Sequence, residues 1–183
     1  MWRTAARHKI ISVLVALLVA GSLITIGVVG SGSGTPGKAA TPKAPAFSLA
    51  ALGQSGQRVT LDQYAGKPLI VNFFASWCQP CKAETPLLAK FYASEHGSVA
   101  LVGLDENDGQ ANAAAFTKAQ GVAYPVGFDP SVTAGSAYGV AALPQTFFLD
   151  AQHHIVDRVF GAVTQASLDK GIALATGARA GSG

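Results

Sequence analysis

Cysteine is scarce in this sequence: the 183 residues include only two, Cys78 and Cys81. Both lie in the run Trp77-Cys78-Gln79-Pro80-Cys81-Lys82, so any sulfur chemistry is confined to one short segment. Two cysteines separated by two residues can form a structural disulfide, half of a zinc site or a reversible redox couple. A disulfide that closes so short a loop restricts the unfolded chain very little, which argues against a purely structural role.

Histidine is scarce as well, and the few histidines do not complete a metal site. A structural zinc ion needs four ligands at characteristic spacings. None of the histidines has such a spacing from the cysteine pair; they are His8, His96, His153 and His154. We therefore expect redox chemistry at the pair, no metal, and no cofactor apart from a redox-active disulfide between Cys78 and Cys81.

Basic residues are few once the N-terminal segment is set aside. The formal net charge is +3, but residues 1–45 contain five of the thirteen Lys and Arg residues and none of the ten Asp and Glu residues. The remaining residues therefore carry eight basic against ten acidic side chains. No basic patch indicates a nucleic-acid partner.

One long uncharged run does occur, at residues 10–30. As a helix it would span roughly 30 Å, which matches the core of a bilayer. Arg3, Arg7 and Lys9 precede it, so residues 1–9 are predicted to stay in the cytoplasm and the C-terminal domain to lie outside the cell membrane. A cleaved signal peptide usually has a shorter apolar region of about 7 to 15 residues, which favours a single-pass, uncleaved anchor over a cleaved leader.

Composition suggests the remaining boundaries. Residues 31–45 are rich in Gly, Ser, Thr and Pro, which is typical of a flexible linker. Residues 46–176 are expected to form one domain, and residues 177–183 a disordered tail.

The domain has the pattern of an α/β protein. Strands are predicted at residues 47–52, 58–61, 69–74, 99–104 and 155–160 and directly after Pro144. Helices are predicted at residues 80–96, 110–120, 132–138 and 165–175, and residues 124–126 and 129–130 read as a connection. This alternation, with a hairpin near the C-terminus, predicts a mixed sheet covered by helices on both faces.

The cysteine pair is predicted where a buried strand gives way to a helix. The unpaired N–H groups and the macrodipole at a helix N-terminus favour an anion, so the pKa of the Cys78 thiol should be lowered and Cys78 should be the nucleophile. Pro80 suits the first helical turn, where its missing N–H costs nothing. Cys81, one turn further, should be more buried and resolve the mixed disulfide. Glu84 shares its helical face and is expected to exchange protons with Cys81; the alternative is an ordinary acidic residue of a first turn.

Two motifs carry a resemblance to a known family. Trp77-Cys78-Gln79-Pro80-Cys81 and the later run Leu143-Pro144-Gln145-Thr146-Phe147-Phe148-Leu149-Asp150, with Pro86 between them, resemble the TlpA/ResA/CcmG group of membrane-anchored thioredoxin-like proteins. The resemblance covers roughly residues 45–176. It implies a thioredoxin-like fold with an N-terminal β-hairpin extension, preceded here by one transmembrane helix.

The same resemblance implies roles for individual residues. Pro144 is expected in the cis form, facing the cysteines, with the backbone around Leu143 beside the bound polypeptide. Asn72 stands where cytosolic thioredoxins have a buried aspartate, and the ResA-like members combine that replacement with a glutamate at the position of Glu84. Supporting roles at the active site fall to Trp77, Gln79, Pro80, Leu143 and Pro144.

The resemblance further implies a thiol–disulfide oxidoreductase that acts on exported cysteine-containing proteins, such as apocytochrome c, and receives electrons from a membrane thiol carrier. A reductant is expected, and the alternative is an oxidase that inserts disulfides into exported proteins. A copper-delivery module would space its cysteines differently and add a histidine ligand, and a thiol peroxidase would carry proline and threonine before its nucleophile.

The acidic run at residues 105–108 is expected to form a solvated loop that caps the next helix, with a second carboxylate near the active site as the alternative.

Overall fold

The computed structural model describes residues 41–94 and 97–178 of the chain. The predicted anchor at residues 10–30, most of the predicted linker and most of the predicted tail lie outside these residues. Within the described part of the chain, no helix combines the length and the hydropathy needed to cross a membrane.

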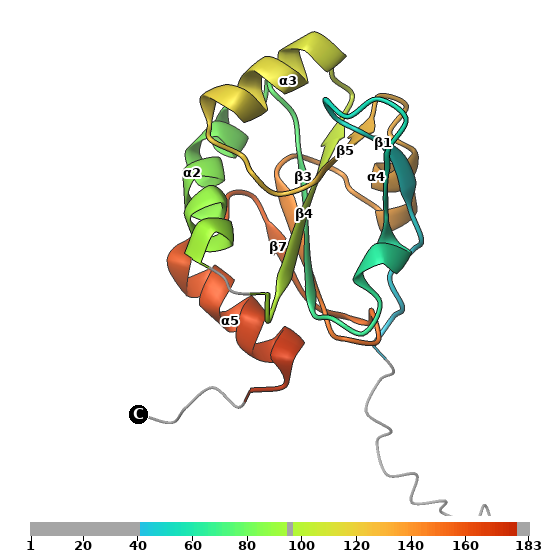
Figure 1. Cartoon of the computed structure of the whole chain (residues 1–183). Coiled ribbons are helices and arrows are strands. Elements are labelled where there is room, and N and C mark those ends of the chain that lie inside the picture. The colour runs from blue at the N-terminus through green and yellow to red at the C-terminus, as the bar shows by residue number, and fades with distance from the viewer. Residues whose placement is uncertain (1–40, 95–96, 179–183) are drawn as a thin grey trace, which may run out of the picture. The chain divides into compact units, whose positions relative to one another are not determined.

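A mixed sheet of seven strands forms the centre of the described domain (Figure 1). Its strands are β1 (Ser48–Ala51), β2 (Arg58–Thr60), β3 (Leu69–Phe74), β4 (Ala100–Glu106), β5 (Val126–Asp129), β6 (Gln145–Leu149) and β7 (Ile155–Phe160). They follow the order β2-β1-β5-β4-β3-β6-β7. The strands β3, β4 and β5 are parallel, and the other neighbouring pairs are antiparallel. The carboxyl ends of β3 and β4 therefore meet at one end of the sheet, where the cysteine pair follows β3.

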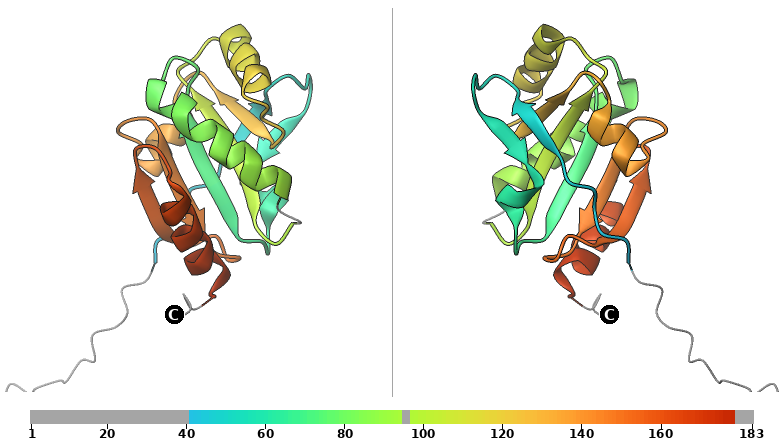
Figure 2. Two further views of the ribbon diagram at one scale, coloured as in Figure 1. Left: turned by 90° about the vertical axis from the view of Figure 1, so that its left-hand side faces the viewer. Right: turned by 90° about the vertical axis from the view of Figure 1, so that its right-hand side faces the viewer.

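Helices cover both faces of this sheet. One face carries α2 (Gln79–Ser94), α3 (Gln110–Ala119) and α5 (Gln165–Thr176), and the other carries α4 (Thr133–Tyr138) and the 3-10 helix η1 (Leu61–Tyr64). The two views in Figure 2 show these faces in turn. The arrangement is a thioredoxin-like α/β fold with an N-terminal hairpin, as the sequence predicted.

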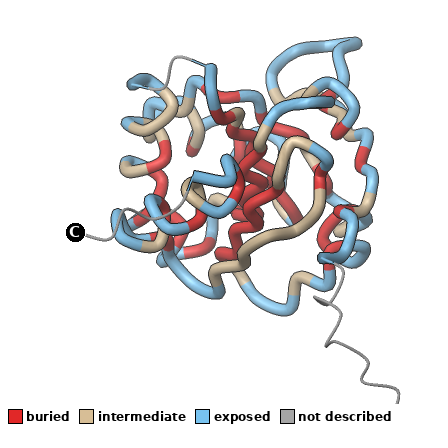
Figure 3. Tube along the Cα trace, turned by 90° about the horizontal axis from the view of Figure 1, so that it is seen from below, coloured by how far each residue is buried: buried red, intermediate tan, exposed pale blue. Residues whose placement is uncertain are grey.

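The central strand β3 is buried along its whole length, which fits its unbroken run of β-forming residues. Its side chains alternate between the two faces. Ile70 and Phe74 join the apolar cluster beneath α2, α3 and α5, whereas Phe73 packs against Tyr138 of α4 with ring centroids 5.2 Å apart. Figure 3 shows the buried residues concentrated in the central strands. Burial of one such aromatic side chain contributes roughly 1.5–3 kcal/mol, so β3 fixes the position of the segment that follows it.

The prediction of a connection around residues 124–130 was wrong, because Val126–Asp129 forms the strand β5. This strand lies between β4 and β1 and pairs with both. The sequence did not indicate this strand, because Pro125 and Pro130 flank it and four residues are too few to show the alternation of apolar and polar residues that is typical of a strand. At Gly127, a Cβ atom would lie 3.0 Å from side-chain atoms of both Leu49 and Leu104, so the glycine allows the neighbouring side chains to close over the strand.

Candidate active site

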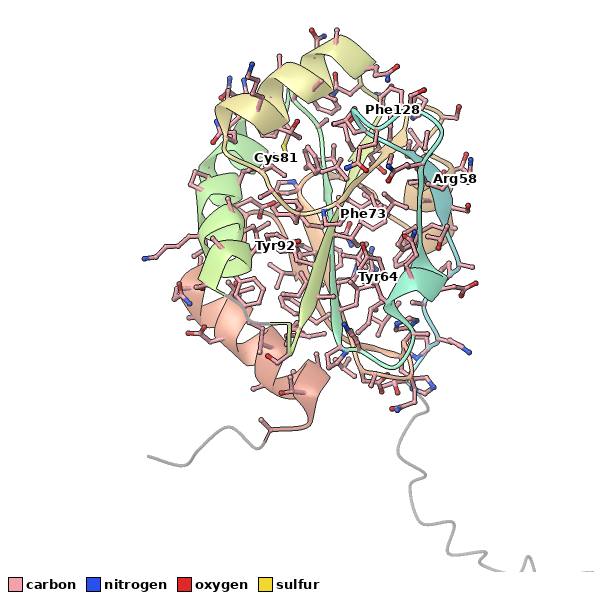
Figure 4. All side chains as sticks on the ribbon, in the orientation of Figure 1. Arg58, Tyr64, Phe73, Cys81, Tyr92 and Phe128 are labelled. Carbon is pink, nitrogen blue, oxygen red and sulfur yellow. A yellow bond between two sulfur atoms is a disulfide. The ribbon has the colours of Figure 1, made fainter. Side chains whose placement is uncertain are left out.

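The cysteine pair lies at the junction of β3 and α2, as predicted. Cys78 and Cys81 form a disulfide with a Cα–Cα distance of 5.3 Å. Cys78 is 4% exposed and Cys81 is fully buried, so attack from outside reaches Cys78 first. Figure 4 shows Cys81 near the N-terminal end of α2, on the side of the helix that faces the sheet.

The first turn of α2 presents a backbone donor to sulfur. The N–H of Cys81 donates a hydrogen bond to Sγ of Cys78 at 3.2 Å. Gln79 and Pro80 are the first two residues of the helix, and both are exposed. The N–H of Cys81 is free to serve the sulfur because the first N–H groups of a helix have no acceptor within the helix, and the missing N–H of Pro80 costs nothing there for the same reason. The same donor would stabilise a thiolate on Cys78 after reduction.

Glu84 is a buried carboxyl group beneath the cysteine pair, on the same helix as Cys81. It is 2% exposed. Its Oε1 accepts from Nδ2 of Asn72 at 2.8 Å, and its Oε2 accepts from the N–H of Val163 at 2.6 Å. Burial raises the pKa of Glu84 to about 7, although the hydrogen bonds from Val163 and Asn72 act in the opposite direction. A carboxyl group that titrates near neutral pH can take up and return a proton.

Asn72 connects the helix of the cysteines to the proline strand. Its side-chain NH₂ group donates to Glu84 and also to Oγ1 of Thr146, at 2.9 Å, on β6. Both donors of the amide are therefore used. An ionised aspartate here could not donate to Glu84, and the two carboxylates would repel each other. The contact of Glu84 with Val163 could not be predicted from the sequence, because 79 positions separate the two residues.

The peptide bond between Leu143 and Pro144 is cis, which confirms the prediction made from the resemblance. Pro144 directly precedes β6, which pairs with β3, so the proline lies at the same end of the sheet as the cysteines. The carbonyl of Pro144 accepts from the N–H of Gly161 at the end of β7. Pro144 is buried, whereas Leu143 is partly exposed.

The prediction of a solvated loop at residues 105–108 was wrong for its first half. Asp105 and Glu106 are the last residues of β4 and are buried, at 0% and 5% exposure. The strand continues because these residues pair with β5, which the sequence pattern had not indicated. Asp108 accepts from the N–H of Ser76 at 2.6 Å, so the acidic segment contacts the loop that carries the cysteines.

Asp105 and Asp108 form a carboxyl pair behind this loop. The pKa of Asp105 is raised to about 8, mainly by burial and in part by the neighbouring carboxyl group of Asp108. Partial burial also acts to raise the pKa of Asp108, but hydrogen bonds from Ser76 and from the N–H of Gly109 outweigh it and lower that pKa. Near neutral pH, Asp105 therefore holds the proton and Asp108 the charge.

Exposed apolar side chains surround the site. Trp77 is 55% exposed, and its Nε1–H donates to the carbonyl of Asn107 at 2.9 Å, which fixes the ring beside Cys78. Phe160, which pairs with Gln145 next to the cis-proline, is 71% exposed. Large exposed aromatic side chains of this kind are suited to contact with a polypeptide.

Comparison with known proteins agrees with this geometry. Residues 40–158 match the AhpC/TSA family. The chain belongs to that family. Among its relatives, the thiol:disulfide interchange protein HelX of Rhodobacter capsulatus is 32% identical over 160 residues, which cover 82% of this chain and 89% of HelX. The thiol-disulfide oxidoreductase ResA of Bacillus thuringiensis is 28% identical over 128 residues, which cover 69% of this chain and 73% of ResA.

Solved structures of similar proteins share the fold. The structure of MTB dsbF superposes with a TM-score of 0.65 at 27% identity, over 71% of this chain and 95% of that one. A DsbF homologue from Corynebacterium diphtheriae gives a TM-score of 0.65 at 27% identity, over 72% of this chain and 84% of that one. The protein described here is an enzyme of the thiol–disulfide oxidoreductase class. In the described residues, no group of three or more His, Cys, Asp or Glu side chains is arranged to hold a metal ion.

Proposed function

We propose that the protein reduces disulfide bonds in exported proteins, through Cys78 and Cys81, on the outer side of the cell membrane. The observation that supports this function best is the disulfide at the start of α2 with the buried carboxyl of Glu84 beneath it. The pair supplies two electrons, and Glu84 supplies a proton acceptor for the buried thiol.

The reaction consists of two exchanges. The Cys78 thiolate attacks one sulfur of the client disulfide, whose S–S bond breaks, and the second client sulfur leaves as a thiolate that takes up a proton. Cys81 then loses its proton to Glu84 and attacks Sγ of Cys78. The mixed disulfide breaks, the client leaves with both cysteines reduced, and the Cys78–Cys81 disulfide forms. A dithiol donor, for which we propose a membrane thiol carrier, returns two electrons to the pair.

The proposed location rests on the sequence. The uncharged run at residues 10–30 would anchor the chain, and the basic residues before it would keep the N-terminus in the cytoplasm. A reversible couple in an oxidising compartment also benefits from the lack of further cysteines, which could mispair. The cysteines of apocytochrome c are the clients that we propose, because the resemblance to the TlpA/ResA/CcmG group implies them.

The reduction potential of the Cys78–Cys81 couple tests the direction of electron flow. The full chain in mild detergent would be equilibrated with glutathione or dithiothreitol buffers, and the oxidised fraction would be measured by alkylation. A value near that of thioredoxin, about −270 mV, supports a reductant. A value near that of DsbA, about −120 mV, would instead identify a donor of disulfides, in which electrons pass from the client to the same two cysteines.

A trapping variant tests the clients. Cys81→Ala leaves Cys78 free to form a mixed disulfide that cannot be resolved. We expect the variant, expressed in its native cell, to accumulate disulfide-linked complexes with exported cysteine-containing proteins. The variant Cys78→Ala, which retains the buried cysteine alone, should give none of them. A set of captured proteins without any exported cysteine-containing protein would contradict the proposed function.

A further inference from the structure

A groove lies beside the disulfide, and neither cysteine lines it. We call it the Glu106 groove, and it is lined by Trp77, Glu106, Asn107, Val132 and residues 140–143. Trp77 directly precedes Cys78, and Leu143 directly precedes Pro144, so the groove opens next to the reacting sulfur. Its volume is about 250 Å³. Small-molecule sites are typically about 300–1,000 Å³, so the groove is better suited to one side chain of a bound polypeptide.

Glu106 is an acid with one unpartnered oxygen, in the wall of a groove whose other side chains are mostly apolar. It is 5% exposed, and its Oε2 is buried without a hydrogen-bond partner. The carboxyl group lies against Gly135 of α4, where an added Cβ atom would collide with Oε2. Neither ion pair found among the described residues involves Glu106; these pairs join His154 to Asp150 and Lys170 to Asp157. A poorly solvated carboxyl group attracts a cation that comes close to it more strongly than an exposed carboxyl group does.

Asp129 is a second acid beside Glu106, on the neighbouring strand. Asp129, which pairs with Glu106 across β4 and β5, accepts with both oxygens from the N–H groups at the start of α4. The pKa of Glu106 is raised to about 7, mainly by burial and in part by the charge of Asp129. A cation in the groove would face this acid and stabilise its ionised form.

Trp77 provides a second feature that favours a cation. Its indole ring lines the same groove and is held by the hydrogen bond to Asn107. The face of a tryptophan ring attracts a guanidinium or ammonium group, and arginine also stacks on it through its planar head group. The carboxyl group and the indole are thus two features of one groove that select the same kind of ligand.

We propose that the Glu106 groove binds a basic side chain, arginine in preference to lysine, that lies beside the reacting cysteine of the client polypeptide. Glu106 is then a residue that determines specificity, and it takes no part in the exchange of sulfurs. This inference rests on the proposed function, because it assumes that a polypeptide disulfide is the substrate.

Three disulfide peptides, which differ in one residue next to a cysteine, test the proposal. That residue is arginine, citrulline or glutamate, and citrulline keeps the shape of arginine without its charge. The full chain in mild detergent is first reduced and freed of reductant, and single-turnover reduction of each peptide is followed by acid quench, alkylation and mass spectrometry. We expect the arginine peptide to react about fivefold faster than the citrulline peptide, and the glutamate peptide to react slowest.

Two carboxyl-to-amide variants give the matched comparison. Glu106→Gln keeps the size of the side chain and should abolish the preference for arginine over citrulline. Asp62→Asn removes the same charge from the exposed surface of η1 and should keep the preference. Trp77→Leu, which leaves Glu106 in place, should reduce the preference only in part.

The outcomes separate the inference from the function on which it rests. Equal rates for arginine and citrulline peptides in the unsubstituted protein would overturn the inference, as would a preference that survives in Glu106→Gln. In both cases the peptides are still reduced, so the proposed function stands. If no peptide is reduced although dithiothreitol reduces all of them, the proposed function fails and the inference fails with it.

Discussion

At the scale of single residues, the position of Glu84 suits the proposed role of a proton acceptor for a buried thiol. The carboxyl group lies one turn beyond Cys81 and is held from two sides, by Asn72 and by the N–H of Val163. It is therefore fixed in orientation and also poorly solvated. These two properties suit a group that exchanges one proton with one neighbour.

Replacement of Glu84 by Gln should slow the resolving step and change its pH dependence. In the unsubstituted protein, the rate at which Cys81 resolves a mixed disulfide should rise as the pH increases through about 7, where Glu84 becomes a carboxylate. In Glu84→Gln, the rise should move to higher pH, where the thiol ionises by itself, and the rate at pH 7 should fall by about 100-fold. Stopped-flow measurement of resolution between pH 5 and 9 checks this. An unchanged pH profile would rule out the proton-exchange role.

Replacement of Asn72 by Asp tests the amide bridge. The variant places a second carboxyl group at hydrogen-bond distance from Glu84, and two such groups resist ionising together. We expect the pKa of the pair's second ionisation to lie above that of Glu84 alone, and the free energy of unfolding at pH 8 to fall by about 2 kcal/mol or more. Urea denaturation at pH 5 and pH 8 measures the effect. A loss of stability that is equal at both pH values would instead indicate a steric cause.

At the scale of secondary-structure elements, α5 depends on a glycine for its approach to β6. A Cβ atom at Gly171 would collide with ring atoms of Phe148, which is fully buried. The helix backbone therefore rests directly on an aromatic ring of the sheet. A larger residue must move either the helix or the ring.

The variant Gly171→Ala should therefore destabilise the protein by about 1–3 kcal/mol. In a helix without this contact, the same change would stabilise by roughly 0.5–1 kcal/mol, because alanine is the better helix former. Urea denaturation with the disulfide intact measures the change in the free energy of unfolding. The sign of that change shows whether the close contact with Phe148 is present. A more stable variant would contradict the close approach.

Elements with a clear period or strong end signals could be predicted from the sequence, whereas contacts between distant elements could not. The buried run that forms β3 and the helix that begins at the cysteines were both predicted, and Pro144 was placed by a motif. The strand β5 was missed because it is four residues long between two prolines. The burial of Asp105 and Glu106 was missed for the same reason, since it depends on β5 as the neighbour of β4.

At the scale of the whole domain, buried acids set the pH dependence of stability. Burial raises the pKa values of Glu84, Asp105 and Glu106 to about 7, about 8 and about 7, whereas unfolded carboxyl groups titrate near 4. Between about pH 4 and about pH 8, the folded state therefore binds more protons than the unfolded state. Its stability therefore falls as the pH rises through this window.

We expect the free energy of unfolding to be lower at pH 8 than at pH 5 by roughly 2 kcal/mol or more. Below about pH 4 the trend should reverse, because hydrogen bonds lower the pKa values of Asp108 and Asp150 despite their partial burial, and protonation of these groups removes their contribution. Chemical denaturation of the oxidised protein across pH 3 to 9 measures the curve. Stability that is constant or rises between pH 5 and 8 would show that these carboxyl groups are not buried in solution.

The two hydrogen bonds that Glu84 accepts have one more consequence. A proton on Glu84 turns one of its two acceptor oxygens into a hydroxyl, so Asn72 or the N–H of Val163 loses the stronger part of its bond. Val163 lies two residues after Gly161, whose N–H holds the carbonyl of Pro144. In the proposed mechanism, each proton that Cys81 passes to Glu84 therefore weakens one of the contacts that hold Asn72 or the backbone at Val163. The proposed proton transfer is in this way linked to the backbone segment at residues 161–163, which also holds the carbonyl of Pro144.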